Sequence, residues 1–251
     1  MGRGIEPVGT GDAQTRPIGQ VSARPVRDPF GVRSNPNVGR ARNSVVQSIL
    51  VLRHGETTWN TAGRWQGWID IELSDTGIAQ ANARAETLAD AGITFGTVVS
   101  SDLARAARTA EIIADRLAAP AVERHWGLRE RCGGEFEGLD ATAIDAGWPG
   151  FRERWRAGLE DAPPGGESDD VLWERVRAVL RELHDANRAG PILVVTHGGV
   201  ARVLSDRSGC PTRSVIPNVG GRWYDWDGHV LIAGDALETI PDTDRTKPAM
   251  E

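Results

Sequence analysis

Cationic and titratable side chains follow three apolar segments of this sequence at the points where the segments end. The set comprises Arg53 and His54 after residues 48–52, Arg105 shortly after residues 97–101, and His197 after residues 191–196. Since an unpaired buried charge is costly, a partner must meet these groups. Guanidinium groups match the paired oxygens of phosphate and carboxylate. We therefore expect the four side chains to converge on an anion, and phosphate fits best because it can contact all four at once.

A histidine held against a bound phosphoryl group can act as a nucleophile. Imidazole is nucleophilic at neutral pH, and a covalent intermediate divides one difficult displacement into two easier ones. The other common route for phosphate chemistry uses a metal cluster, which needs several carboxylates near the same site. No group of Asp and Glu residues follows the three apolar segments. The residues therefore favour a reaction that uses no metal and no cofactor.

Strands and helices alternate along the part of the chain that must position these groups. The continuous apolar runs at 48–52, 97–101 and 191–196 are typical of strands buried on both faces of a parallel sheet. Apolar residues at helical spacing predict four helices: one after Ser74 with Ile78, Ala81, Ala85 and Leu88 inside, one from Asp102, one from Ser168 to Gly190, and one after His197. Residues 222–234 predict a hairpin that turns at Asp227 and Gly228.

This alternation predicts an α/β fold, a three-layer α/β/α sandwich with a mostly parallel central sheet. In such sheets ligands bind beyond the carboxyl ends of the strands, where the cationic groups are expected to meet. We expect residues 139–166 to form a small helical or loop excursion over the site. Two interpretations of its Trp148, Phe151, Arg152, Trp155 and Arg156 stay open. They form a wall for a substrate with an apolar or second anionic part, or the aromatic rings pack this segment while the arginines face water.

Composition sets the limits of this domain within the 251 residues. Residues 1–44 hold five prolines, seven glycines and seven arginines against three acidic residues, which predicts a disordered basic extension. The domain is expected at 45–234, and a weakly ordered tail at 235–251. No apolar stretch approaches the roughly 18 residues of a membrane span, and the two cysteines indicate no disulfide framework. We therefore expect a cytoplasmic protein.

Seven motifs occur in order along residues 48–234. They are LRHGETTWN at 52–60, GRWQGWID at 63–70, LSDTGIAQA at 73–81, SSDLARAARTA at 100–110, LRERCGGEFEG at 128–138, PGGES at 164–168 and VVTHGG at 194–199. Together they resemble the motifs of the histidine phosphatase superfamily, in its phosphoglycerate-mutase-like branch. Seven separated motifs in one order are far more specific than the RHG tripeptide alone.

The resemblance implies roles for single residues of this chain. His54 matches the residue that accepts the phosphoryl group, and Glu130 matches the acid that protonates the leaving oxygen. The phosphate pocket is implied to consist of Arg53, Arg105 and His197, with further substrate contacts at Asn60, Gln66, Gly67 and Gly198. The same Glu130, once deprotonated, can activate the water that cleaves phosphohistidine.

Two acidic residues and one glycine lie close to this acid in the sequence. Glu135 and Glu137 lie close to Glu130 and are rival candidates for the acid, but we expect both to be solvated loop residues. Gly133 stands where the family usually has a bulky residue, so the local packing is expected to differ there.

Three functions are compatible with such a pocket. The favoured one is a metal-independent phosphomonoesterase, a histidine acid or broad-specificity phosphatase, that hydrolyses a small phosphorylated metabolite through phosphohistidine on His54. The second is a cofactor-dependent phosphoglycerate mutase. Mutases of the family tend to carry a longer insertion and a tyrosine after the acid, whereas Tyr224 is the only tyrosine here. The third is a non-catalytic phospho-ligand binding protein. Such a protein would have lost at least one of the proposed catalytic residues, and none of them is missing: Arg53, His54, Arg105, Glu130 and His197.

The expected partner is therefore a small-molecule phosphomonoester. We expect neither nucleic acid nor a membrane as a partner, and a homodimer stays open.

Overall fold

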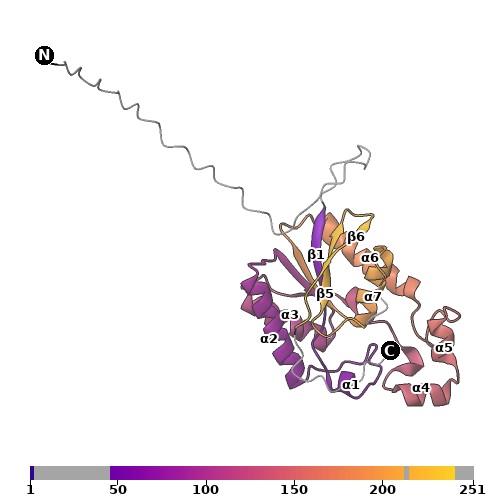
Figure 1. Cartoon of the computed structure of the whole chain (residues 1–251). Coiled ribbons are helices and arrows are strands. Elements are labelled where there is room, and N and C mark those ends of the chain that lie inside the picture. The colour runs from indigo at the N-terminus through magenta and orange to yellow at the C-terminus, as the bar shows by residue number, and fades with distance from the viewer. Residues whose placement is uncertain (3–45, 212–214, 241–251) are drawn as a thin grey trace. The chain divides into compact units, whose positions relative to one another are not determined.

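In the part of the chain that the structure describes, six strands form one sheet in the order β3-β2-β4-β1-β5-β6 (Figure 1). Their bounds are β1 Gln47–Arg53, β2 Thr97–Ser100, β3 Glu123–Arg124, β4 Ile192–Thr196, β5 Gly221–Trp226 and β6 Leu231–Ala236. The pairs β1–β4, β2–β4 and β2–β3 are parallel, whereas β5 runs antiparallel to both of its neighbours. The three strands predicted from apolar runs are thus adjacent at the centre, and the mostly parallel sheet is confirmed.

The computed structural model describes residues 1–2, 46–211 and 215–240. The chain divides into two units, Met1–Arg42 and Asn43–Glu251, and all the helices and strands described belong to the second. The predicted disordered extension, apart from its first two residues, and the last part of the predicted tail lie outside the described residues.

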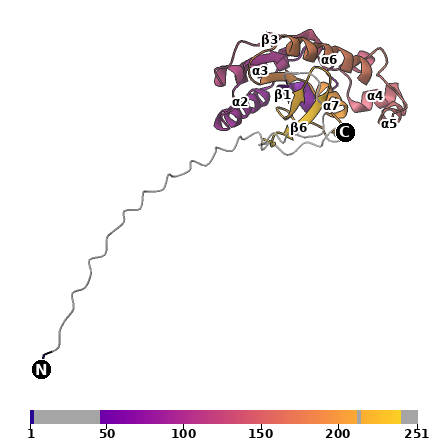
Figure 2. The ribbon, with the colours of Figure 1, turned by 90° about the horizontal axis from the view of Figure 1, so that it is seen from above.

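Helices cover both faces of the sheet. Their bounds are α1 Thr58–Thr61, α2 Asp75–Asp90, α3 Ala104–Arg116, α4 Ala141–Gly147, α5 Phe151–Arg156, α6 Asp169–Asp185 and α7 Gly198–Arg207, and two 3₁₀ turns span Trp126–Leu128 and Gly134–Phe136. Apolar residues of α2 and α3 pack with one face of the central strands, and those of α6 and α7 pack with the other (Figure 2). The three-layer α/β/α arrangement is confirmed. Among the described residues, no helix combines the length and apolar character needed to cross a membrane.

The register of β1 on β4 brings two site segments together. Ile49 lies opposite Ile192 and Arg53 opposite Thr196, so both strands end at the same level. Their apolar side chains are fully buried because the sheet is covered on both sides, and each such side chain stabilises the fold by about 1.5–3 kcal/mol. The histidines that follow, His54 and His197, therefore emerge side by side at the carboxyl edge of the sheet.

Helix α2 follows its prediction with one exception. The Ser74 side chain accepts a hydrogen bond from the backbone N–H of Gly77 at 3.1 Å and caps the helix. Ile78, expected inside, is exposed because it lies at the edge of the buried stripe. Arg84, on the other edge of this stripe, is buried, and its Nε donates to the carbonyl of Val219 at 2.9 Å.

Two other helix boundaries differ from the sequence-based expectation. Helix α3 begins at Ala104 instead of Asp102. The Asp102 carboxylate does not cap this helix but accepts hydrogen bonds from Nε and one terminal nitrogen of Arg129 at 2.8 and 2.6 Å. Helix α6 is capped by Ser168 as predicted, but it ends at Asp185, five residues before Gly190.

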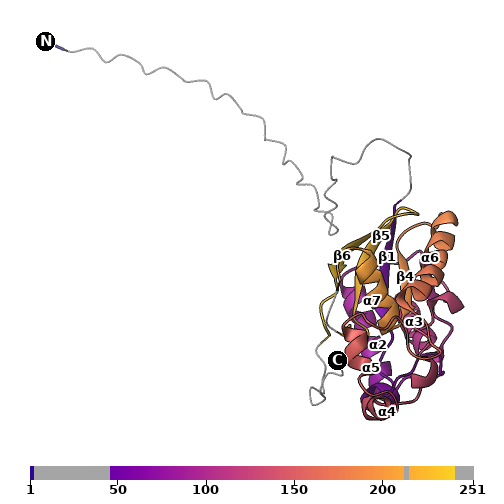
Figure 3. The same ribbon diagram turned by 90° about the vertical axis from the view of Figure 1, so that its right-hand side faces the viewer.

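The segment predicted as an excursion contains two short helices, α4 and α5. They lie beyond the carboxyl ends of the parallel strands (Figures 1 and 3). Phe136, Ile144 and Phe151 form a buried cluster here, and Trp65, Trp148 and Trp155 pack against it. This aromatic cluster is separate from the two clusters of the sheet, so the excursion has a small core of its own.

The predicted hairpin is confirmed as β5 and β6. The carboxylate of Asp227 accepts backbone hydrogen bonds from His229 and Val230 at 2.8 and 2.7 Å, which closes the turn, and Gly228 adopts φ +90°. Strand β6 reaches Ala236, two residues beyond the expected end of the domain.

Candidate active site

His54 is fixed by backbone contacts directly after β1. Its N–H donates to the carbonyl of Thr196 at 2.9 Å and so continues the pairing of β1 with β4. Its side-chain Nδ1 lies 2.6 Å from the carbonyl oxygen of Gly55. Because a carbonyl can only accept, this hydrogen bond places the ring proton on Nδ1 and leaves the lone pair on Nε2. A neutral imidazole in this tautomer is ready to act as a nucleophile.

The glycine after His54 is required by a close approach of two backbones. A Cβ atom on Gly55 would lie 2.5 Å from the carbonyl oxygen of Gly77, at the start of α2. The N–H of Gly55 donates to the Thr109 hydroxyl at 3.0 Å, and that hydroxyl donates to the carbonyl of Arg105 at 2.7 Å. The segment after β1 is thereby tied to α3, the helix that carries the second arginine.

Arg105 is fully buried at the first turn of α3. Its two terminal nitrogens donate to the carbonyls of Ile69 and Gly67 at 2.9 and 2.8 Å. Burial lowers the pKa of Arg105 to about 10, against the opposing effect of the nearby Glu130 carboxylate. The side chain is still cationic at neutral pH, so a full positive charge is held inside the site.

His197 lies behind His54 at the start of α7. The two ring centroids are 5.1 Å apart with an interplanar angle of 61°. Burial lowers the pKa of both imidazoles well below the ordinary value, and the charge of Arg105 lowers them further. Both rings are therefore neutral at pH 7 in the free protein.

Glu130 is held at the N-terminus of α7. Its carboxylate accepts hydrogen bonds from the backbone N–H of Gly199 at 3.0 and 3.1 Å and from that of Arg131 at 2.7 Å. A Cβ atom on Gly199 would lie 2.2 Å from the Glu130 Oε1 atom, so the contact depends on a glycine at this position.

A cavity of about 270 Å³ connects these groups. Eight of the nine residues predicted for the site line it: Arg53, His54, Asn60, Gln66, Gly67, Arg105, Glu130 and Gly198. The ninth, His197, packs against His54 from behind. The Asn60 side-chain oxygen accepts from the N–H of Thr57 at 3.0 Å and belongs to a capping box at the start of α1.

Several buried polar atoms at this cavity have no hydrogen-bond partner among the described residues. They are Arg53 Nε, Arg105 Nε, Arg131 Nη1 and Gln66 Oε1 in the lining, and both ring nitrogens of His197 directly behind it. Most of these atoms can donate, and the lining is predominantly cationic, so a phosphate oxyanion suits the cavity. Within the described part of the chain, no three His, Cys, Asp or Glu side chains are grouped so that they could hold a metal ion.

Sequence reasoning missed Arg175, which organises the segment that carries Glu130. Its guanidinium donates to the backbone carbonyls of Gly127, Arg129 and Glu130 at 2.7–3.0 Å. It also pairs with the Glu167 carboxylate at 2.7 Å, and both side chains are nearly buried. The only sequence signal was Glu167 within the PGGES motif; nothing there identified its partner on α6.

The expectation that Glu137 is a solvated loop residue is wrong. Its carboxylate is half-buried and accepts backbone hydrogen bonds from Trp68 at 2.9 Å and from Gly133 at 2.8 Å. Two loops thus meet at one acceptor, because their N–H groups lack a strand or helix partner. The unusual Gly133 has a reason too, since a Cβ atom there would lie 2.6 Å from Trp65 Nε1. Glu135 is exposed, as expected.

The model of the histidine phosphatase superfamily (branch 1) matches residues 49–211 of this chain. The chain belongs to the histidine phosphatase superfamily. The resemblance drawn from the seven motifs is thereby confirmed, and the matched residues include all nine of the predicted site.

Relatives of this histidine phosphatase include enzymes named for different phosphomonoesters. It is 37% identical over 202 residues to the glucosyl-3-phosphoglycerate phosphatase of Mycolicibacterium vanbaalenii, covering 76% of this chain and 88% of the relative. It is 39% identical over 163 residues to the metal-independent phosphoserine phosphatase of Arabidopsis thaliana, covering 64% of this chain and 68% of that one.

A solved structure of a mycobacterial glucosyl-3-phosphoglycerate phosphatase in complex with VO3 superimposes with a TM-score of 0.64 at 33% identity. The alignment covers 75% of this chain and 96% of the mycobacterial one. The superfamily and these phosphatase relatives make the protein a phosphoric monoester hydrolase.

Proposed function

We propose that this histidine phosphatase hydrolyses a small phosphorylated metabolite through a phosphohistidine on His54. The observation that carries the proposal is the hydrogen bond from His54 Nδ1 to the Gly55 carbonyl, which leaves the Nε2 lone pair free in a cationic cavity. A fixed tautomer removes the cost of reorienting the nucleophile before attack.

In the first step the phosphoryl group binds to the side chains of Arg53, Arg105 and His197. His54 Nε2 attacks phosphorus, and the bond from phosphorus to the leaving oxygen breaks with its electron pair on that oxygen. Glu130, as the carboxylic acid, transfers its proton to the leaving oxygen and becomes a carboxylate. The guanidinium groups neutralise charge on the equatorial oxygens throughout.

In the second step water takes the place of the departed alcohol. The Glu130 carboxylate accepts a proton from this water while its oxygen attacks phosphorus. The bond between phosphorus and Nε2 breaks, and its electron pair returns to the imidazole. Phosphate leaves, and both residues regain their starting forms.

The same first step would serve a mutase, in which a second hydroxyl group replaces water as the acceptor. We favour hydrolysis because two relatives, at 37% and 39% identity, carry names of specific phosphatases, whereas another relative at 39% is named only as a phosphoglycerate mutase-like protein. Reaction in ¹⁸O-labelled water distinguishes the two, since hydrolysis places one labelled oxygen in the released phosphate.

We further propose that the reaction needs no metal, because two arginines supply the positive charge that a metal would otherwise provide. Activity should survive exhaustive EDTA treatment, and vanadate should inhibit by filling the cationic cavity. A cytoplasmic location stays a prediction from the sequence.

Rapid-quench labelling with a ³²P-labelled substrate tests the central proposal. The wild-type protein should carry an acid-labile, base-stable phosphoryl group, and His54→Ala should carry none while keeping the circular dichroism spectrum of the wild type. Label on a serine, aspartate or cysteine would contradict the mechanism.

A further inference from the structure

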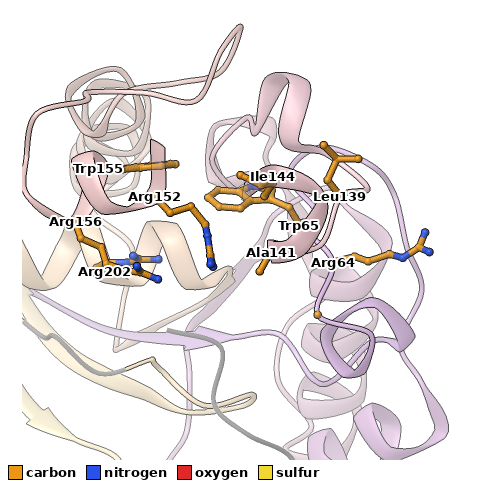
Figure 4. Close-up of a pocket in the computed structure, with 10 residues that line it drawn as sticks. Arg64, Trp65, Leu139, Ala141, Ile144, Arg152, Trp155, Arg156 and Arg202 are labelled. Atoms are coloured by element: carbon orange, nitrogen blue, oxygen red, sulfur yellow. The ribbon is translucent and has the colours of Figure 1, made fainter. Parts of the chain in front are cut away.

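A second cavity of about 440 Å³ adjoins the phosphate pocket (Figure 4). The two cavities share four lining residues, Arg64, Trp65, Trp155 and Arg202. The second cavity falls in the size range of small-molecule sites, whereas the first holds little more than a phosphoryl group and its immediate surroundings. A phosphomonoester bound at His54 would therefore extend its leaving group toward this second cavity.

One wall of the second cavity is apolar. The rings of Trp65 and Trp155 stack with centroids 5.5 Å apart and an interplanar angle of 28°. Leu139, Ala141 and Ile144 continue this surface from α4 and the turn before it. The Trp rings belong to the aromatic cluster of the excursion, so the wall is held rigidly. A carbon skeleton, such as the ring of a sugar, suits such a surface.

The side of the cavity from which Trp155 projects also forms a cationic wall (Figure 4). Arg152, Arg156 and Arg202 reach in from one side, whereas Arg64 points away on the other (Figure 4). Arg152 is already neutralised, because Asp145 accepts two hydrogen bonds from it at 2.7 Å. Arg156 lies 3.9 Å from Glu153. No acidic side chain is among the described residues that line this cavity.

Arg202 differs from the other arginines of this wall. It forms no hydrogen bond or ion pair with any described residue, and it lines both cavities. It lies four positions after Gly198 on α7, so both are on the helix face that borders the phosphate pocket. Its charge acts on Asp206, one turn further along α7, whose pKa it lowers against the effect of burial. It also lowers the pKa of Arg53, by less than burial does and by less than the Glu130 carboxylate raises it. An anion at the junction of the two cavities would relieve this repulsion between like charges.

We propose that the second cavity binds the leaving group of the substrate, and that Arg202 pairs there with a second anionic group, a carboxylate or a phosphate, on that leaving group. This inference rests on the proposed hydrolase function for its substrate. Of the two interpretations that the sequence left open for residues 139–166, it favours a substrate wall for Arg152, Trp155 and Arg156, whereas Trp148 and Phe151 pack inside the excursion. It also adds Arg202 of α7, which the sequence did not single out.

The test compares ligands that differ only in the second anion. Binding is measured by calorimetry with the His54→Ala protein, which cannot turn the ligands over. One pair is 3-phosphoglycerate against glycerol 3-phosphate, which lacks the carboxylate; the other is glucose 1,6-bisphosphate against glucose 6-phosphate, which lacks the second phosphate. We expect at least one pair to show about a tenfold preference for the doubly anionic member, because a charged hydrogen bond is worth about that factor or more.

Substitution of Arg202 should remove this preference. In His54→Ala/Arg202→Gln the preference should fall about tenfold, and in His54→Ala/Arg202→Lys it should fall less. Arg181→Gln, on the exposed side of α6, is the matched control and should retain the full preference. An unchanged preference in the Arg202→Gln protein, or equal binding of both members of both pairs before substitution, would overturn the inference.

Kinetics of the wild-type protein separate this inference from the hydrolase proposal. If p-nitrophenyl phosphate is hydrolysed but neither pair shows a preference, the second-anion site is wrong and the hydrolase stands. If no phosphomonoester is hydrolysed but the Arg202-dependent preference persists, the binding site stands and the hydrolase function is wrong.

Discussion

The Glu130 carboxylate accepts hydrogen bonds from the backbone N–H of Gly199 with both of its oxygens, at 3.0 and 3.1 Å. Residue 199 is the second residue of α7, the helix that begins after His197. Helix α7, which follows β4, therefore positions the proposed acid, although Glu130 precedes Gly199 by 69 residues in the sequence.

Gly199→Ala should displace this acid without removing it. The added Cβ would lie 2.2 Å from Glu130 Oε1, so the carboxylate must move. We expect the rate of His54 phosphorylation by alkyl phosphates to fall more than the rate with p-nitrophenyl phosphate, whose leaving group needs little protonation. Single-turnover kinetics with both substrates measure this ratio.

Gly198→Ala is the matched control, because its Cβ would meet nothing closer than 3.7 Å. The ratio of the two rates should stay near that of the wild type in this variant. Equal ratios in Gly199→Ala and Gly198→Ala would show that the contact with residue 199 does not position Glu130.

Glu130→Gln tests the proton transfer itself. Positioned acids contribute about 10²–10⁴-fold, so phosphorylation by alkyl phosphates should slow by that factor, or roughly 3–5 kcal/mol. With p-nitrophenyl phosphate a burst of p-nitrophenol should precede slow turnover, since the water still lacks its base. Equal losses on both substrates in single-turnover assays would show that Glu130 is not the acid. The exposed Glu135→Gln serves as a control, whereas Glu137 does not, because it holds two loops together.

Arg175 should act as a positioning residue for Glu130. In Arg175→Met the carbonyls of Gly127, Arg129 and Glu130 lose a donor and Glu167 loses its partner. Breaking a buried pair costs about 3–5 kcal/mol, so urea denaturation should show a marked loss of stability. Adding Glu167→Gln should restore part of it, because the uncompensated carboxylate is removed.

The effect of Arg175→Met on catalysis distinguishes a role in positioning Glu130 from a role in the stability of the fold alone. The alkyl phosphate rate should fall more than the p-nitrophenyl phosphate rate, as in Glu130→Gln. If the rates with both substrates fall by the same factor in the folded variant, Arg175 stabilises the fold but does not position Glu130.

The free energy of unfolding should decrease as the pH is lowered below about 6.5, the ordinary pKa of histidine. Because the pKa values of His54 and His197 are lowered in the folded protein, the unfolded chain takes up protons first as the pH falls. The free energy of unfolding should therefore decrease by about 1.4 kcal/mol per pH unit for each imidazole. This loss continues down to the lowered pKa values, below which the folded state is protonated as well.

Urea denaturation between pH 7.5 and 5.5 measures this slope. It should be shallower in His54→Gln, which has lost one of the two imidazoles. It should also flatten in inorganic phosphate, since a bound anion favours the charged rings. A wild-type slope of zero over this range would contradict the burial of neutral imidazoles.

The central sheet and the convergence of the cationic side chains at its edge were predictable because their signals are local. β1 and β4 are continuous apolar runs, and Arg53, His54 and His197 follow them directly, so the rule for parallel sheets places them together. The hairpin turn at Asp227 and Gly228 was predictable for the same reason, since its residues select the turn.

The contacts that the sequence did not reveal are formed between distant segments. Helices α4 and α5 have seven and six residues, too short for a clear helical period, and they depend on the aromatic cluster for stability. Arg175 and Glu137 act through backbone groups of loops that approach them only in the folded chain. No pattern in the sequence distinguishes such side chains from solvated ones.

The separate core of the excursion bears on how this fold diversifies in evolution. Phe136, Ile144 and Phe151 stabilise α4 and α5 independently of the two clusters that hold the sheet. Substitutions in the excursion can therefore reshape the surface presented to a leaving group while the strand ends and the phosphate pocket keep their geometry. New specificities can be selected in one part of the chain at little cost to the phosphoryl chemistry encoded in the other.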